Sequence, residues 1–173
     1  MRDGNHRLIR GAIAGMIGGL VASWTMNQFQ AGISKVEEAW QKSSHQQQPK
    51  QQSSDATATE RAAQRLSHAI LGRDLTADEM RIAEPLVHYG FGTLSGGVYG
   101  FLAELSPLAT KGTGSLFGTA LWLVADEIAV PKLQLSKPPE AYPPKVHAEA
   151  LAAHLVYGVT TEEVRRGVRA TLS

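Results

Sequence analysis

The side chains best suited to chemistry in this sequence are three histidines and three carboxylates that lie within or beside apolar stretches. Ionisable groups at membrane depth are costly, so residues of this kind are candidates for function. Histidine titrates near neutral pH, and a nearby carboxylate can exchange a proton with it. His147 and His154 are seven residues apart and therefore share one face of a helix. The candidate polar cluster consists of His88, Asp126, Glu127, His147, Glu149 and His154.

The sequence leaves three interpretations of this cluster open. The residues can be helix-end groups that form ion pairs between helices, they can form a proton or ion path, or they can bind a metal through imidazole and carboxylate ligands. No spacing matches a known metal motif. His147 and Glu149 also point about 200° apart on a helix, so a metal site has the least support and the metal stays unknown.

No pattern in the sequence favours an enzyme. The chain contains no cysteine, which excludes thiolate metal sites. Gly90-x-Gly92 and Gly112-x-Gly114 lack the strand–turn–helix setting that a phosphate loop or dinucleotide fingerprint needs. We therefore expect neither catalysis nor a cofactor. The net charge of +1 also provides no basic field for nucleic acid.

The elements that must position the cluster are glycine-rich. Five of the eleven residues from Gly90 to Gly100 are glycine, and each costs a helix in water about 1 kcal/mol relative to alanine. In a bilayer the backbone must satisfy its own hydrogen bonds, so this apolar stretch is expected to be a transmembrane helix. Spacing of four residues between small side chains lets two such helices approach closely. The packing glycines are Gly92, Gly96 and Gly100, together with Gly11, Gly15, Gly19, Gly114 and Gly118 at the same spacing.

The predicted fold class is all-α, a helical transmembrane bundle of about four spans with a short amphipathic helical hairpin and a disordered polar linker. The 24 uncharged residues from Gly11 to Ser34 exceed the roughly 20 needed to cross a bilayer. A cleaved signal peptide is the rival interpretation of this first segment. The predicted segments are a basic N-terminus and first span (1–42), a disordered Gln/Ser-rich linker (43–56), an amphipathic hairpin (57–84), three further membrane helices (85–161) and a basic helical end (162–173).

Capping signals define the hairpin. Thr57 or Thr59 can cap its first helix, Gly72 can stop it, and Thr76-Ala-Asp-Glu79 is a capping box for the next helix. Pro85 is expected to kink that next helix.

In the four-span arrangement seven basic residues lie near the helix ends on each side of the membrane, so this count does not decide the orientation. The orientation therefore rests on the first helix. The first helix is preceded by arginines, which favours cytoplasmic termini. Four spans then gather the polar cluster in the outer leaflet and leave Glu104 alone at the inner end. A tight turn near residue 108 should make the second and third spans neighbours, so we expect His88 and Asp126 to pair.

Three stretches resemble a known family. They are the run from His88 to Gly100, the step Ala125-Asp126-Glu127, and His154-Leu-Val-Tyr-Gly158. With them the chain resembles the YagU-like small bacterial inner-membrane proteins, which have an uncharacterised domain. The resemblance implies a multi-span location in the inner membrane and carries no catalytic residues.

The function expected from the sequence is a non-enzymatic, glycine-packed scaffold or assembly-type membrane protein. Its expected partners are the lipid bilayer and, through the same glycine stripes, a second copy or another membrane protein. The alternative is a proton- or ion-coupled membrane protein that uses the polar cluster.

Overall fold

The computed structural model describes residues 2–43 and 56–172, and in these two stretches every regular element is a helix. This confirms the all-α class. Most of the predicted linker lies outside the described residues. The elements are α1 (Arg2–Ser43), α2 (Ala58–Leu71), α3 (Ala77–Leu105), α4 (Ser115–Trp122), the π-helix η1 (Leu123–Ala129), α5 (Val130–Lys132), the 3-10 turn η2 (Pro139–Ala141) and α6 (Pro144–Thr171).

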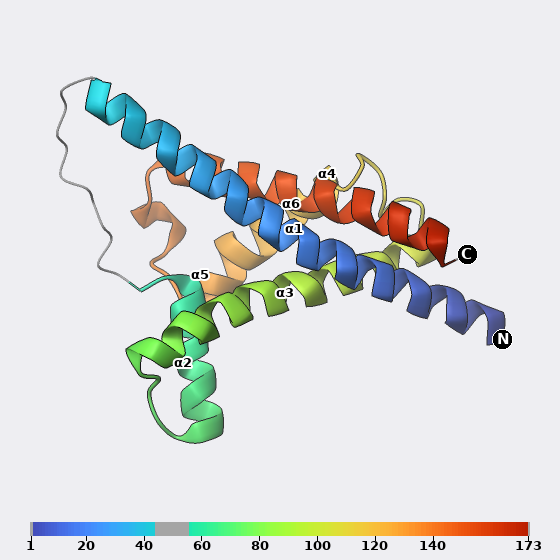
Figure 1. Cartoon of the computed structure of the whole chain (residues 1–173), viewed down its shortest axis with the longest axis horizontal. Coiled ribbons are helices and arrows are strands. Elements are labelled where there is room, and N and C mark those ends of the chain that lie inside the picture. The colour runs from blue at the N-terminus through green and yellow to red at the C-terminus, as the bar shows by residue number, and fades with distance from the viewer. Residues whose placement is uncertain (1, 44–55, 173) are drawn as a thin grey trace.

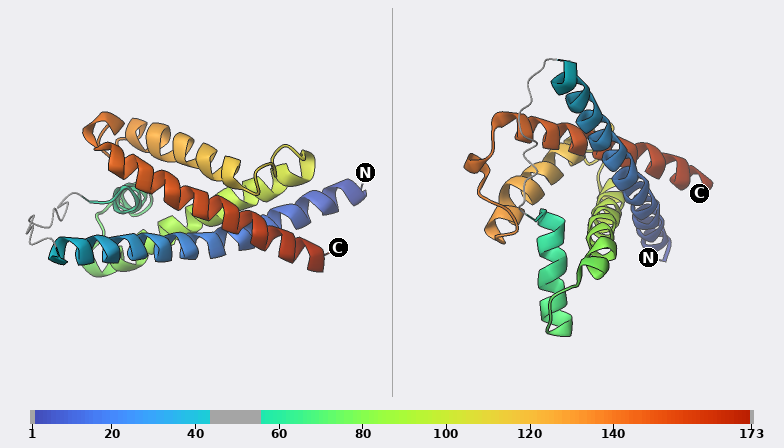
Figure 2. Two further views of the ribbon diagram at one scale, coloured as in Figure 1. Left: turned by 90° about the horizontal axis from the view of Figure 1, so that it is seen from above. Right: turned by 60° about the vertical axis from the view of Figure 1, so that its left-hand side comes forward.

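Four helical runs lie lengthwise in the bundle: α1, α3, α4 continued by η1 and α5, and α6. Successive runs point in opposite directions, so both chain ends lie at the same end of the molecule (Figure 1; Figure 2). α1 packs against α3 and α6, α4 packs against α6, and α2 packs against α3.

Backbone contact between α1 and α3 occurs at the glycines. A Cβ atom added at Gly15 would overlap the carbonyl oxygen of Gly96, and one added at Gly96 would overlap that of Gly15. Gly11 and Gly100 lie against each other farther along the same seam. The predicted packing glycines of both helices therefore lie where no side chain fits. Such close approach gives van der Waals contact along the two backbones.

The glycines of α4 contact α6 instead of α3. A Cβ at Gly114 would overlap the carbonyl oxygen of Gly158, and one at Gly118 would overlap that of His154. The sequence analysis expected the second and third spans to be neighbours, whereas the glycines of α4 face α6. α1 already packs against the glycine face of α3. The glycine face of α4 therefore packs against α6, where Gly158 has no side chain in the way.

Of the described helices, only α1 is long and apolar enough to meet the composition criterion for a membrane span, over Gly4–Ser43. α3 has no Asp, Glu, Lys or Arg between Glu84 and Glu104, but its glycines and His88 make this stretch less apolar than α1. α6 carries charged residues near both of its ends. α3 also continues through Pro85 and joins the second half of the predicted hairpin to the next predicted span as one helix.

The predicted caps of α2 and α3 are confirmed. Thr57 and Thr76 each form a complete capping box, and Gly72 ends α2 in the left-handed conformation with φ of 68°. Arg73 donates two hydrogen bonds to the Glu79 carboxylate, at 2.9 and 2.6 Å. These bonds and those from Thr76 hold the pKa of Glu79 down at about 2, so the α2–α3 connection keeps its ion pair across neutral pH.

The α1–α3 contact predicts a sharp difference between two glycines of α3. Gly96→Ala should destabilise the protein by about 1–3 kcal/mol or more, because its methyl group would be forced into the α1 backbone. Gly90 has no atom near its would-be Cβ, so Gly90→Ala should leave stability unchanged or raise it. Thermal unfolding in detergent measures both, and equal losses would contradict the proposed contact.

Candidate functional site

Two of the predicted cluster residues form a close pair between η1 and α6. Nδ1 of His147 lies 2.6 Å from Oε1 of Glu127, and Nε2 lies 3.1 Å from the carbonyl oxygen of Pro139. A carbonyl can only accept, so Nε2 carries a hydrogen. The imidazole of His147 thus lies between two acceptors, the Glu127 carboxylate and the carbonyl oxygen of Pro139.

A second, looser pair lies two turns farther along α6. Nδ1 of His154 is 2.9 Å from the carbonyl oxygen of Ala150 and 3.6 Å from Oδ2 of Asp126. The backbone carbonyl takes the hydrogen bond, and Asp126 contributes an electrostatic contact. The side chain of Asp126 is 38 % exposed, whereas that of His154 is buried.

The π-helix η1 places both carboxylates on α6. Asp126 and Glu127 are adjacent in sequence, yet they meet histidines that are seven residues apart. π-helical turns are rare and often occur at functional sites. Beside them is a pocket of about 210 Å³ to which both carboxylates and His147 contribute, together with Pro131, Lys137 and Tyr142 among others.

The other two cluster residues lie elsewhere. His88 does not pair with Asp126, whose ion-pair partner is His154, and the buried Nε2 of His88 has no hydrogen-bond partner among the described residues. The predicted pair fails because α4 packs on α6. Glu149 lies 3.5 Å from Lys145 in the first turns of α6. In the described part of the chain no three metal-ligating side chains converge on one point.

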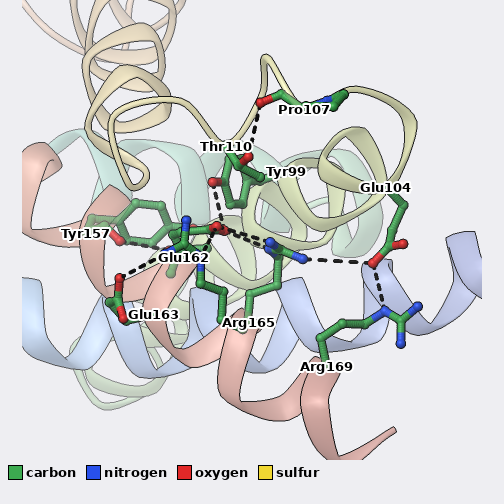
Figure 3. A network of polar contacts seen from close by, with 11 residues as sticks. Tyr99, Glu104, Pro107, Thr110, Tyr157, Glu162, Glu163, Arg165 and Arg169 are labelled. Carbon is green, nitrogen blue, oxygen red and sulfur yellow. Dashed lines mark hydrogen bonds and ion pairs between the residues drawn. The ribbon is translucent and has the colours of Figure 1, made fainter. Parts of the chain in front are cut away.

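The most deeply buried charge is one that the sequence analysis missed. Glu162 on α6 is 0 % exposed. It accepts hydrogen bonds from the Tyr99 hydroxyl at 2.9 Å, from Arg165 at 2.7 and 3.1 Å, and from Arg166 at 2.6 Å (Figure 3). These bonds satisfy both carboxylate oxygens and tie α3 to α6.

Glu104 extends this network and is not alone, contrary to expectation. Arg169 donates to its carboxylate at 2.7 Å, and Arg165 lies at 3.9 Å (Figure 3). Arg7 of α1 lies 3.5 Å from the same carboxylate. Three helices are joined at the end where the chain begins and finishes. We name the residues Tyr99, Glu104, Glu162, Arg165, Arg166 and Arg169 the terminal-end network.

One sequence signal could have identified part of this network. Glu162 precedes Arg165 by three residues and Arg166 by four, which are the spacings of helical ion pairs. The spacing of Glu162 from these arginines does not indicate that its carboxylate is buried. The burial arises because Gly18 of α1 lies against the backbone of Thr161, while Gly114 lies against the side chain of Glu162.

A family described as "Protein of unknown function (DUF1440)" matches residues 41–163 of this chain. The match includes both histidine–carboxylate pairs and Glu162, and it excludes most of α1 and the arginines at the end of α6. No curated protein and no solved structure matches the chain.

The terminal-end network predicts different outcomes for two adjacent carboxylates. Glu162→Gln should destabilise the protein by about 3–5 kcal/mol, because the buried Arg165 loses its closest counter-charge. Glu163 is 59 % exposed and lies 3.7 Å from Arg166, so Glu163→Gln should cost at most about 1 kcal/mol. Unfolding in detergent compares the two, and matching values would show that burial of Glu162 does not matter.

Proposed function

Since the chain belongs to the DUF1440 family of unknown function, we propose that it is a multi-pass inner-membrane protein that acts as a glycine-packed scaffold or assembly-type protein. The proposal keeps the YagU-like assignment suggested by the sequence. It describes a non-enzymatic protein whose partners are the lipid bilayer and a second copy or another membrane protein.

One observation carries the membrane part of the proposal: most of the large aliphatic side chains are outside, and most of the buried residues are small. Leu94 on α3 is 66 % exposed and Trp24 on α1 is 55 % exposed. The residues buried between the helices are mostly alanine, serine and glycine, as Ala14, Ala22 and Ser23 illustrate. A protein in water buries large aliphatic residues and rarely leaves extended apolar patches open. Lipid chains are the surroundings in which this surface is stable.

The lengths of the helical runs are consistent with four crossings. The shortest run, from Ser115 to Lys132, has 18 residues and a length of about 27 Å at 1.5 Å per residue. The hydrocarbon core of a bilayer is about 30 Å thick. Several ionisable groups that would enter this layer are paired, His154 with Asp126 of η1 and Arg165 with Glu162, which lowers the cost of placing them there.

Pairing of the ionisable groups also favours the scaffold over the ion-coupled alternative. A transporter needs charged groups that face a cavity open to water, whereas Glu162 and Glu104 are bonded to arginines inside the bundle. The alternative keeps one supporting observation. The hydrogen bond between His147 and Glu127 lies beside the pocket at η1, where the neighbouring Asp126 is partly exposed.

Cysteine labelling in intact cells tests the four crossings, because the chain has no cysteine of its own. With cytoplasmic termini, single cysteines at Gly4, Lys111 and Thr171 should react only after the membrane is made permeable. Cysteines at Asp74 and Lys137 should react from outside. If Lys111 and Lys137 label from the same side, the number of crossings is not four. If every site reports the opposite side, the orientation is reversed.

Native mass spectrometry of the detergent-purified protein tests the assembly part. We expect a homo-oligomer or a co-purifying membrane protein, because glycine-packed helices leave long apolar surfaces for further contacts. A lone monomer in detergents of several classes would contradict the scaffold. Proton uptake by proteoliposomes that is lost in His147→Gln but kept in the surface variant Glu163→Gln would support the ion-coupled alternative instead.

A further inference from the structure

The amphipathic helix α2 uses only part of its apolar face to pack on the bundle. Ala63 and Ser67 are buried where α2 meets α3. Leu66 and Ile70, which lie within about 100° of them on the same helix, are 52 % and 76 % exposed. The small residues make the contact, and the large ones are left outside it.

The early part of α3 also exposes large apolar side chains. Ile82 and Leu86, one turn apart, are 73 % and 70 % exposed. Farther along α3, Leu94 and Val98 are also exposed, and they belong to the surface that the proposed function assigns to lipid. The apolar side of the α2–α3 hairpin is therefore continuous with the lateral surface of the bundle.

The direction of α2 sets it apart from the four lengthwise runs. α2 crosses the long axis of the bundle in Figure 1 and is seen end-on in Figure 2 (left). In a bundle that spans a bilayer the long axis follows the membrane normal, so α2 lies in the plane of the membrane. Its opposite face carries Arg61, Arg65 and His68, and of these Arg65 donates to the carbonyl oxygens of Leu133 and Gln134 while His68 contacts Asp74. A helix with one apolar face and one basic face, lying in the plane of the membrane, is the form taken by interfacial helices.

We propose that α2 and the first turns of α3 form an interfacial platform on the side of the membrane opposite the chain ends, with Leu66, Ile70, Ile82 and Leu86 inserted between headgroups and acyl chains. The occupant of this face is lipid and not a second protein, because the face merges with the lipid-facing side of α3. Basic side chains beside it, including the exposed Arg81, are placed to meet headgroup phosphates. The inference rests on the proposed membrane function.

Spin labels on single cysteines of the full chain test the platform. Ile70→Cys reports the apolar face of α2, and His68→Cys, about 200° around the helix, is the matched control on the polar face. Leu94→Cys reports the lateral surface of the bundle. Each labelled protein is reconstituted in vesicles of phosphatidylethanolamine and phosphatidylglycerol. Collisions with oxygen, which concentrates in lipid, are compared with collisions with a water-soluble nickel chelate.

The expected ratio of oxygen to nickel collisions is severalfold higher at residue 70 than at residue 68, and highest at residue 94. Equal ratios at residues 70 and 68 would overturn the platform. Loss of both kinds of collision at residue 70 would also overturn it, because protein would then cover the face. A water-like ratio at residue 94 would refute the membrane bundle itself, whereas a lipid-like ratio there with a water-like ratio at residue 70 refutes the platform alone.

Discussion

Contact between helix backbones, which is possible only where a side chain is missing, is the constraint on which the rest of this bundle depends. At the α1–α3 seam Gly15 and Gly96 lie against each other's carbonyl groups, and at the α4–α6 seam Gly114 and Gly158 do the same. Helices this close leave little interior space for large side chains, and among the described residues Met26, Tyr99 and Tyr157 are the large apolar ones that are buried. Most large aliphatic residues lie on the outside, and the interior is held together by dispersion contacts and polar bonds. The exposure of the large apolar residues and the small size of most buried residues thus both follow from close contact between the helix backbones.

The same close packing explains where charge can be buried. Gly18 and Gly114 bring neighbouring backbone over Thr161 and Glu162, and water is excluded there. A carboxylate in such a place needs hydrogen-bond donors for both oxygens, since an unpaired buried charge is strongly destabilising. Tyr99 and two arginines provide them. A fully satisfied polar network in a low-dielectric interior rigidifies the elements that it joins. The terminal-end network therefore complements the glycine seams: the seams set the distance between helices, and the network sets how they are aligned along their length.

The sequence predicted those features that depend on local rules. Helical capping at Thr57 and Thr76, and the stop at Gly72, follow from side chains a few residues apart, and the structure bears them out. Partner choice was not predictable in the same way. The spacing of glycines identifies a helix face that lacks side chains, but it does not identify the helix against which that face packs. Here Gly158 provides the contact through which α4 packs against α6. The expected pair of His88 with Asp126 failed for this reason. The π-helix was equally hidden, because no residue pattern in Leu123–Ala129 distinguishes it from an ordinary turn of α-helix.

The two ends of the bundle treat ionisable groups in opposite ways. At the end with the termini, Glu162 is fully enclosed, and its oxygens are occupied by tyrosine and arginine donors that hold their protons at neutral pH. At the other end, His147 and Glu127 are hydrogen-bonded, the nearby Asp126 is partly exposed, and a pocket lies beside them. Proton exchange requires a group that titrates near neutral pH and a route to water, and at this end a histidine lies beside a pocket. The glycine seams and the terminal-end network hold the helices in place, so a change of charge at η1 would act on the π-helix and its pocket before it could alter the packing of the bundle.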